Sequence, residues 1–329
     1  MTQKTFTRRQ LVATVASAAV ASPFLKAAAT AEPGKTMRGV FPIMATPFTA
    51  TKAVDWEDLA HEVEFLDRCN VPGMVWPQLA SENSKLTKEE RLRGMEVIAK
   101  AGKGKKPAII LGVQGANSKE AMEYLEHAEK LDPDGLIALP PTQAKTIDEW
   151  REYYHTLARA TKRPLFIQNS LSGTKLVPSI EVLVELAREY PNCAYFKEEI
   201  KPEIERQLEL AKHRPVVKRV FAGGGGRNLL YVLRLGLDGV MAGNAYADVC
   251  VDIWNLYSEG QKEKAREIYS KLLLVLACEP QIDGTRQYMM KRRGVFKTMV
   301  SRQKDISISP EEAKELEFNF DSLKSHLRV

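Results

Sequence analysis

The segment Cys193-Ala194-Tyr195-Phe196-Lys197-Glu198-Glu199 is a short apolar run that ends in a lysine and two carboxylates. It lies within a long series of alternating apolar and amphipathic stretches. In a barrel of alternating strands and helices, this position places the lysine at the C-terminal mouth of a central strand, facing the pocket. A lysine in a partly desolvated mouth can attack a carbonyl carbon and form a Schiff base. The alternative is a surface lysine at a strand end that is paired with a neighbouring glutamate.

The chain on both sides of this run alternates between two patterns. Stretches such as Trp56–Leu66 and Ser179–Ala187 carry apolar residues at helical spacing. Between such stretches lie short apolar runs that we interpret as strands: Val40–Ala45, Gly73–Pro77, Pro107–Val113, Gly135–Leu139, Pro164–Ile167, Cys193–Phe196, Val216–Ala222 and Gly239–Ala242. Eight strands that alternate with eight helices predict an α/β protein with a parallel (β/α)8 TIM barrel. The alternatives are a nine-stranded sheet or an open doubly wound sheet.

Helix boundaries support this organisation. Asp55, Thr87 and Ser118 stand where N-caps are expected for the first three helices. After Asp248 the pattern is purely helical, with more helices than the last barrel unit needs. Those helices are expected at Val249–Tyr257, Gln261–Leu276, Gln287–Ser301 and Pro310–His326. We therefore expect the barrel in residues 32–247 and a C-terminal helical extension in residues 248–329, packed on the barrel or on a neighbouring subunit.

Residues 1–31 have the composition of an export signal. Arg8 and Arg9 form a twin-arginine pair, residues 11–21 are weakly apolar, and residues 27–31 contain A-x-A sites. This pattern predicts a Tat-type signal peptide and a periplasmic protein. The apolar run is too short to remain as a stable membrane span. The alternative is a frayed basic N-terminus.

The charge balance argues against a nucleic-acid partner. The chain has 48 basic and 42 acidic residues, and the first 31 residues contribute four of its six net positive charges. The remainder has a net charge of +2, which gives no basic surface for nucleic acid or anionic lipid. The cysteines show no C-x-x-C spacing, and the five histidines show no ligand spacing, so we expect no metal site.

Several motifs stand in the order and spacing of one known family. They are PIMATPF at Pro42–Phe48, Glu82 followed by LTKEER at Leu86–Arg91, LSG at Leu171–Gly173, YFKE at Tyr195–Glu198 and LDGVMA at Leu237–Ala242. Through them, residues 39–247 resemble the dihydrodipicolinate synthase / N-acetylneuraminate lyase family. The resemblance implies a (β/α)8 barrel in which a lysine forms an imine with pyruvate or another 2-oxo acid. Such enzymes then make or break a carbon–carbon bond, or dehydrate a sugar acid.

The resemblance also implies roles for particular residues. Lys197 corresponds to the imine-forming lysine. Leu79 and Ala80 fall in the loop whose backbone N–H groups hold the substrate carboxylate, unless this loop is remodelled and merely packs. Asn169 and Met241 are further candidates for substrate contact. The family implies no cofactor, a small-molecule 2-oxo acid or sugar-acid substrate, and a homo-oligomer, either a tetramer or a dimer.

The chain departs from the family at positions that usually move protons. The loop that normally reads GTTGE here reads Gln78-Leu79-Ala80-Ser81-Glu82. Gln168 takes the place of the catalytic tyrosine on the fifth strand, and a second tyrosine falls at about Thr142. An amide cannot act as a general acid or base near neutral pH, so synthesis of dihydrodipicolinate by the usual relay is not expected. The groups that could substitute are Ser81, Ser170, Tyr246, Glu199 and water.

Two further features remain open at this point. Glu82 can fix its loop by accepting backbone hydrogen bonds, or it can act as an acid or base. The run Gly223–Gly226 follows the seventh strand and opens a helix, where barrels often bind phosphate. A flexible turn, or a close approach to substrate, is the alternative interpretation.

These observations predict an exported Schiff-base lyase or aldolase with a nonstandard proton relay, acting on a pyruvate-like 2-oxo acid or a sugar-acid derivative. The alternative is a catalytically impaired family member that binds small carboxylates in the periplasm. A third hypothesis is a scaffold protein that binds no ligand. The intact Lys197 favours the enzyme, and the loss of relay groups favours the binding protein.

Overall fold

The computed structural model describes residues 35–328, so the predicted signal segment, residues 1–31, lies outside the described residues. Within the described part, eight parallel strands form one sheet in the order β1-β8-β7-β6-β5-β4-β3-β2. They are β1 (Gly39–Val40), β2 (Gly73–Trp76), β3 (Ala108–Gly112), β4 (Gly135–Ala138), β5 (Leu165–Asn169), β6 (Tyr195–Glu198), β7 (Arg219–Gly225) and β8 (Gly239–Ala242).

The sheet closes just beyond the end of β1. Ile43 forms parallel bridges with Val75 and with Gly243, and the Val75 N–H donates to the Pro42 carbonyl over 3.0 Å. These contacts join β1 to β2 on one side and to the end of β8 on the other. The predicted (β/α)8 barrel is therefore confirmed, and the open doubly wound sheet is excluded.

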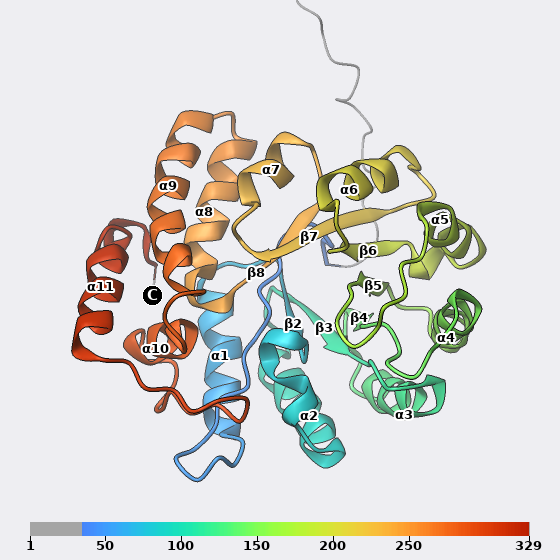
Figure 1. Cartoon of the computed structure of the whole chain (residues 1–329), viewed down its shortest axis with the longest axis horizontal. Helices are drawn as coiled ribbons and strands as arrows, with labels where there is room; N and C mark the ends of the chain where they lie inside the picture. The colour runs from blue at the N-terminus through green and yellow to red at the C-terminus, as the bar shows by residue number, and fades with distance from the viewer. Residues whose placement is uncertain (1–34, 329) are drawn as a thin grey trace, which may run out of the picture. The chain divides into compact units, whose positions relative to one another are not determined.

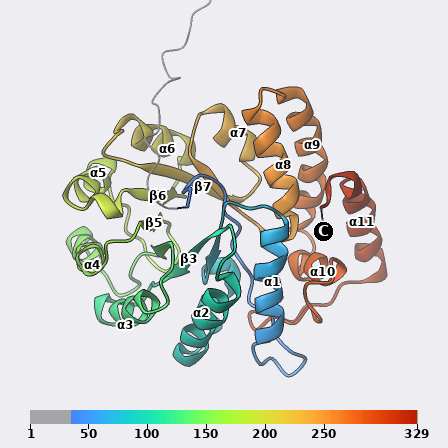
Figure 2. The ribbon, with the colours of Figure 1, turned by 180° about the vertical axis from the view of Figure 1, so that it is seen from behind.

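A ring of helices surrounds the strands (Figure 1 and Figure 2). The ring consists of α1 (Trp56–Arg68), α2 (Lys88–Gly102), α3 (Ser118–Glu129), α4 (Ile147–Ala160), α5 (Ile180–Glu189), α6 (Glu203–Lys212), α7 (Leu229–Arg234) and α8 (Ala247–Ser258). Each helix follows one strand, so every β-to-α loop lies at the C-terminal mouth of the barrel.

The first helices begin where local capping chemistry allows. The Asp55 side chain accepts the Asp58 N–H at the start of α1, and Thr87 forms a capping box with Glu90 at the start of α2. The predicted cap of α3 was one residue late. Its N-cap is Asn117, whose side chain accepts the Glu120 N–H, so Ser118 is the first helical residue.

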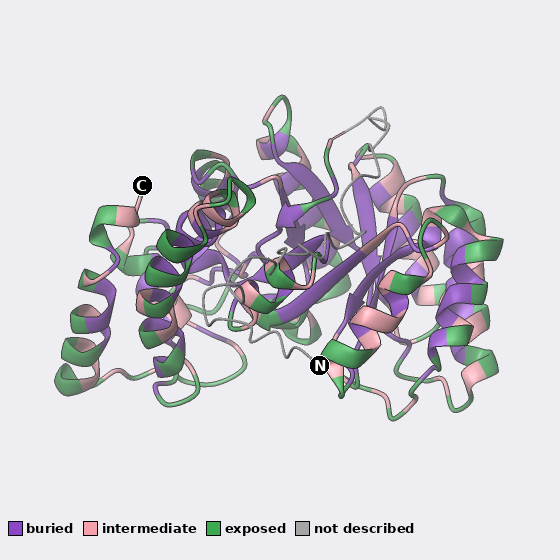
Figure 3. Cartoon of the chain, turned by 90° about the horizontal axis from the view of Figure 1, so that it is seen from above, coloured by how far each residue is buried: buried purple, intermediate pink, exposed green. Residues whose placement is uncertain are grey.

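Aromatic and aliphatic side chains together fill the interior of the barrel. The Phe221 ring meets Phe41 edge-on at 5.1 Å and Phe166 at 5.3 Å. Glycines make room for these rings, since a Cβ at Gly73 or Gly239 would lie 2.2 Å from a ring atom. Buried residues occupy the strands and the inner faces of the helices, while exposed residues lie outside (Figure 3). Ile43 and Met241 of this packed interior also line a cavity at the C-terminal mouth.

The helical extension packs against the barrel. Its helices α9 (Lys262–Cys278), α10 (Thr285–Arg292) and α11 (Pro310–Asp321) lie beside α8 and α1 (Figure 1). The first helix predicted after Asp248 is α8, the eighth barrel helix. The helix predicted at 287–301 ends much earlier, at Arg292, because Gly294 adopts a left-handed φ of 71°. The chain after Gly294 is an extended segment.

Three further expectations concern membrane spans, the cysteines and the relation of the extension to the barrel. No helix in residues 35–328 is both long and apolar enough to cross a membrane. All four cysteines are buried free thiols. The described residues 35–328 belong to one compact unit, so the extension is not a separate body from the barrel.

Candidate active site

Lys197 lies inside the barrel mouth. It is paired in register with Gln168 of the neighbouring strand β5, and only 5% of its surface is exposed. Because successive side chains on a strand point to opposite faces, Lys197 faces inward and Glu198 faces the helices. The alternative of a surface lysine paired with Glu198 is therefore excluded.

Glu199 is the partner of the lysine. Its Oε2 lies 3.2 Å from the Lys197 Nζ and accepts a hydrogen bond of 2.6 Å from the Gln168 Nε2. Gly223 on β7 leaves space for this carboxylate, because a Cβ there would lie 1.8 Å from the Glu199 Oε1. The buried Oε1 of Gln168 makes no hydrogen bond within the described residues. A lysine, a carboxylate and an amide are thus held together at one point.

These groups line a cavity of about 250 Å³ at the mouth. Five of the six site residues that the sequence suggested meet there: Leu79, Ala80, Gln168, Lys197 and Met241. A larger and shallower hollow lies among Glu129 and residues 159–163, which precede β5 at the opposite end of the barrel. We assign the site to the mouth, because in TIM barrels the active site lies at the C-terminal ends of the strands.

Asn169, the sixth suggested residue, does not line this cavity. Its amide donates a 2.8 Å hydrogen bond to Glu198, which also forms an ion pair of 3.2 Å with Arg206 on α6. Burial raises the pKa of the Glu198 carboxyl, and the bond from Arg206 opposes that rise. Asn169 therefore stabilises the outer face of the sheet, and the structure gives no support to its predicted substrate contact.

The loop after β2 is a short 3-10 helix, η1 (Leu79–Ser81), held from several sides. The Ser81 Oγ donates to the Met44 carbonyl over 2.5 Å and accepts the Gln78 N–H over 2.9 Å. The N–H groups of Leu79 and Ala80 find no acceptor among residues 35–328. Both residues line the cavity, and the backbone role predicted for them stays a prediction.

Glu82 fixes this loop, as one of the two sequence interpretations proposed. Its Oε2 accepts the N–H groups of Arg302 and Gln303, each over 2.9 Å. Glu82 itself has a left-handed φ of 56°. The carboxylate thereby ties the extended segment of the C-terminal extension to the cavity loop.

Two arginines on the cavity wall were not found from the sequence. Arg227 follows the glycine run at the end of β7, and Arg286 comes from α10. Both pair with Glu279: the Arg286 Nε lies 2.9 Å from Oε1, and the Arg227 Nη2 lies 2.9 Å from Oε2. The glycine run could have drawn attention to Arg227. No local pattern marks Arg286, because a helix of the extension carries it to the mouth.

The structure also separates the groups that could replace the missing tyrosine. The Ser81 hydroxyl already donates to a backbone carbonyl. Burial raises the pKa of Tyr246 well above 10, and neither Tyr246 nor Ser170 lines the cavity. Glu199 is the one titratable candidate that contacts Lys197. In the part of the chain described, no group of three or more His, Cys, Asp or Glu side chains could hold a metal ion.

Comparison with known proteins identifies the family. The model of the dihydrodipicolinate synthetase family matches residues 36–319. The chain belongs to this family. A 4-hydroxy-tetrahydrodipicolinate synthase of Methanocaldococcus jannaschii is 29% identical over 238 residues, which cover 71% of this chain and 80% of that protein. The 4-hydroxy-tetrahydrodipicolinate synthase of Rhizobium meliloti is 24% identical over 265 residues, which cover 78% of this chain and 88% of that protein.

Solved structures of the dihydrodipicolinate synthetase family show the same fold. A crystal structure of dihydrodipicolinate synthase is 26% identical, with a TM-score of 0.77 over 87% of this chain and 99% of that one. The enzyme from Aquifex aeolicus, 24% identical, has a TM-score of 0.78 over 89% of this chain and 100% of its own. Another match, 21% identical, is a monomeric dihydrodipicolinate synthase variant. Membership of the family therefore leaves the predicted oligomer untested.

Proposed function

We propose that this protein is a Schiff-base-forming lyase or aldolase that acts on a 2-oxo acid or a sugar-acid derivative, with Lys197 as the imine-forming residue. The observation that carries the proposal is the position of Lys197, which is buried at the mouth of a closed barrel and lines a cavity beside Glu199. A volume of about 250 Å³ is just below the usual range of ligand pockets and suits a compact substrate.

The contacts support a route for the protons. A proton moves from the Lys197 ammonium to Glu199, 3.2 Å away, and leaves a neutral amine. The amine attacks the carbonyl carbon, and one of its two protons passes to the carbonyl oxygen to give the carbinolamine. Glu199 then returns its proton to the hydroxyl group, which departs as water and leaves the protonated imine. The protonated imine then accepts electrons from the adjacent carbon when a bond there is broken. Gln168 holds the Glu199 carboxylate by the 2.6 Å hydrogen bond and so orients it.

The remaining cavity wall supports binding of the acid group. The N–H groups of Leu79 and Ala80 are the donors left over by η1. Backbone donors bind a carboxylate through charge-assisted hydrogen bonds whatever their side chains are. The loss of the usual GTTGE side chains therefore leaves this part of the site usable.

Borohydride trapping tests the proposal directly. The protein is incubated with pyruvate and a panel of 2-oxo acids, reduced with borohydride and digested. We expect the mass of the reduced adduct on the peptide that carries Lys197. The Lys197→Ala protein should melt at a similar temperature and should not be labelled. Lys201→Ala, which removes an exposed lysine nearby, serves as the matched control and should be labelled normally.

The alternative function gives a different result. A protein that only binds small carboxylates would show calorimetric binding of pyruvate without any adduct at Lys197. An adduct on another lysine would also contradict the proposed role of Lys197.

A further inference from the structure

The charged groups of the cavity fall into two sets. Four charged residues line it within the described part of the chain: Lys197, Glu199, Arg227 and Arg286. Lys197 and Glu199 are paired with each other at 3.2 Å. The two arginines share a single carboxylate, that of Glu279. One positive charge on the cavity wall is therefore left uncompensated.

The arginines keep donors that face no protein acceptor. Arg286 uses Nε and Nη2 to bind Glu279 at 2.9 and 3.0 Å, while its Nη1 makes no hydrogen bond among residues 35–328. Arg227 uses Nη2 for the Leu276 carbonyl and for Glu279. Its Nη1 donates one long hydrogen bond of 3.5 Å to the Gly224 carbonyl, so the second N–H of this nitrogen has no acceptor among the described residues. Two guanidinium groups thus present unused N–H groups on the wall.

These groups are also held in position. Glu279 is largely buried, with 8% of its side chain exposed. Its ion pairs with Arg227 and Arg286 fix the positions of both guanidinium groups. Gly225 allows the close approach of both guanidinium groups, because a Cβ there would lie 3.0 Å from the Arg286 Nη2 and 3.3 Å from the Arg227 Nη1. Side chains that are already ordered lose little entropy when they bind a ligand. Within the glycine run at the end of β7, Gly225 therefore gives the arginines room, as Gly223 does for Glu199.

We propose that Arg227 and Arg286 form a subsite for a second carboxylate of the substrate, distal to the carbonyl that Lys197 attacks. The planar guanidinium fork matches a carboxylate and binds it more strongly than a neutral donor does. The proposal rests on the proposed function and narrows its substrates to 2-oxo dicarboxylic acids. Lys197 and Glu199 neutralise each other, so the arginines supply the charge that distinguishes a dianionic from a monoanionic substrate.

The test compares two acids of equal chain length. 2-Oxoglutarate carries the distal carboxylate and 2-oxopentanoate lacks it. We expect the concentration that half-saturates borohydride trapping at Lys197 to be at least about tenfold lower for 2-oxoglutarate, because hydrogen bonds between charged groups are stronger than those between neutral groups. Arg286→Met should raise this concentration for 2-oxoglutarate about tenfold or more, and Arg286→Lys should restore part of the loss.

The control variant is Arg234→Met, which removes an exposed arginine of α7 outside the cavity and should change neither value. Equal half-saturation by the two acids in the wild type would overturn the subsite, and so would an equal rise for both acids in Arg286→Met. If no 2-oxo acid labels Lys197, the imine proposal fails separately. Calorimetry with glutarate then decides on the subsite: binding that Arg286→Met abolishes supports it, and no binding overturns it.

Discussion

Glu199 points into the cavity because side chains alternate between the two faces of a strand. Glu198 and Glu199 are neighbours in the sequence, but Glu198 pairs with Arg206 behind the sheet and Glu199 enters the cavity. The space for Glu199 exists because residue 223 is glycine. In the proposed function, this carboxylate beside the amine exchanges the protons that the amide of Gln168 cannot exchange.

Replacing Glu199 should therefore slow proton transfer. The Glu199→Gln protein keeps a side chain of the same shape and should lose about 10²- to 10⁴-fold in the rate at which it exchanges the pyruvate methyl protons in D2O, followed by NMR. Glu205→Gln, which changes an exposed residue of α6, is the control and should exchange at the wild-type rate. A fast exchange in Glu199→Gln would assign the protons to water or to another group.

Glu62 is a second buried carboxylate, away from the cavity. On α1 it accepts the Ala45 N–H over 3.0 Å and the Asn244 amide over 2.7 Å, and its Oε2 has no partner among the described residues. Burial raises the pKa of Glu62 to about 8, and the bonds from Asn244 and Ala45 oppose this rise only in part. The folded protein therefore keeps a proton at neutral pH that the unfolded chain releases.

The sign of the pH dependence follows from this raised pKa. The contribution of Glu62 to stability is fully present below its ordinary pKa of 4.5 and is lost as the pH rises toward 8. We expect the free energy of unfolding to fall across this window by up to about 1.4 kcal/mol per pH unit from this group. In Glu62→Gln the decline should be shallower in urea titrations between pH 5 and 9. The exposed Glu64→Gln of the same helix is the control, and an identical slope in Glu62→Gln would contradict the assignment.

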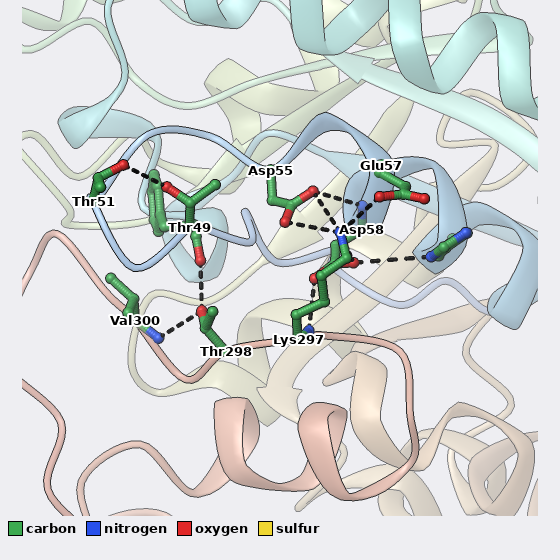
Figure 4. A network of polar contacts seen from close by, with 10 residues as sticks. Thr49, Thr51, Asp55, Glu57, Asp58, Lys297, Thr298 and Val300 are labelled. Carbon is green, nitrogen blue, oxygen red and sulfur yellow. Dashed lines mark hydrogen bonds and ion pairs between the residues drawn. The ribbon is translucent and has the colours of Figure 1, made fainter.

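At the scale of elements, one extended segment connects the extension to the barrel. We call residues 295–304 the C-terminal strap. The Lys297 N–H donates to Asp58 over 2.7 Å, and its Nζ reaches Asp55 and Glu57 at the start of α1 (Figure 4). These carboxylates raise the pKa of Lys297, with Glu57 as the largest cause. Further along, the strap meets Glu82 and so supports the cavity loop.

The attachment of the strap to the barrel should depend more on the buried acceptor Asp58 than on the solvent-exposed ion pairs of Lys297. Asp58 is 3% exposed at its side chain, whereas Lys297 is 51% exposed, and exposed ion pairs contribute little. Asp58→Ala leaves the Lys297 N–H without an acceptor and should cost about 1–3 kcal/mol in urea unfolding. Lys297→Met keeps that N–H and should cost clearly less. Equal losses in the two variants would show that the ion pairs hold the strap.

At the scale of the whole molecule, local patterns predicted most of the barrel. The apolar runs and caps reflect contacts between neighbours in the sequence, so the strands and the inward position of Lys197 could be predicted. Alternation could also have excluded Asn169, since adjacent strand residues face opposite sides. The early end of α10 was signalled only by Gly294. The position of Arg286 at the cavity depends on how the extension packs, which no local pattern encodes.

The last prediction concerns the full chain and rests on its first 31 residues. The Arg8-Arg9 pair, the weakly apolar run and the A-x-A sites lead us to propose export by the twin-arginine route. Arg8→Lys with Arg9→Lys preserves the charge but removes the twin arginines, so the unprocessed protein should accumulate in the cytoplasm. Lys4→Gln changes the charge outside the pair and should be exported normally. Cell fractionation with mass spectrometry of the N-terminus measures both. A wild-type protein found at full length in the cytoplasm would refute the proposal, as would normal export of the double lysine variant.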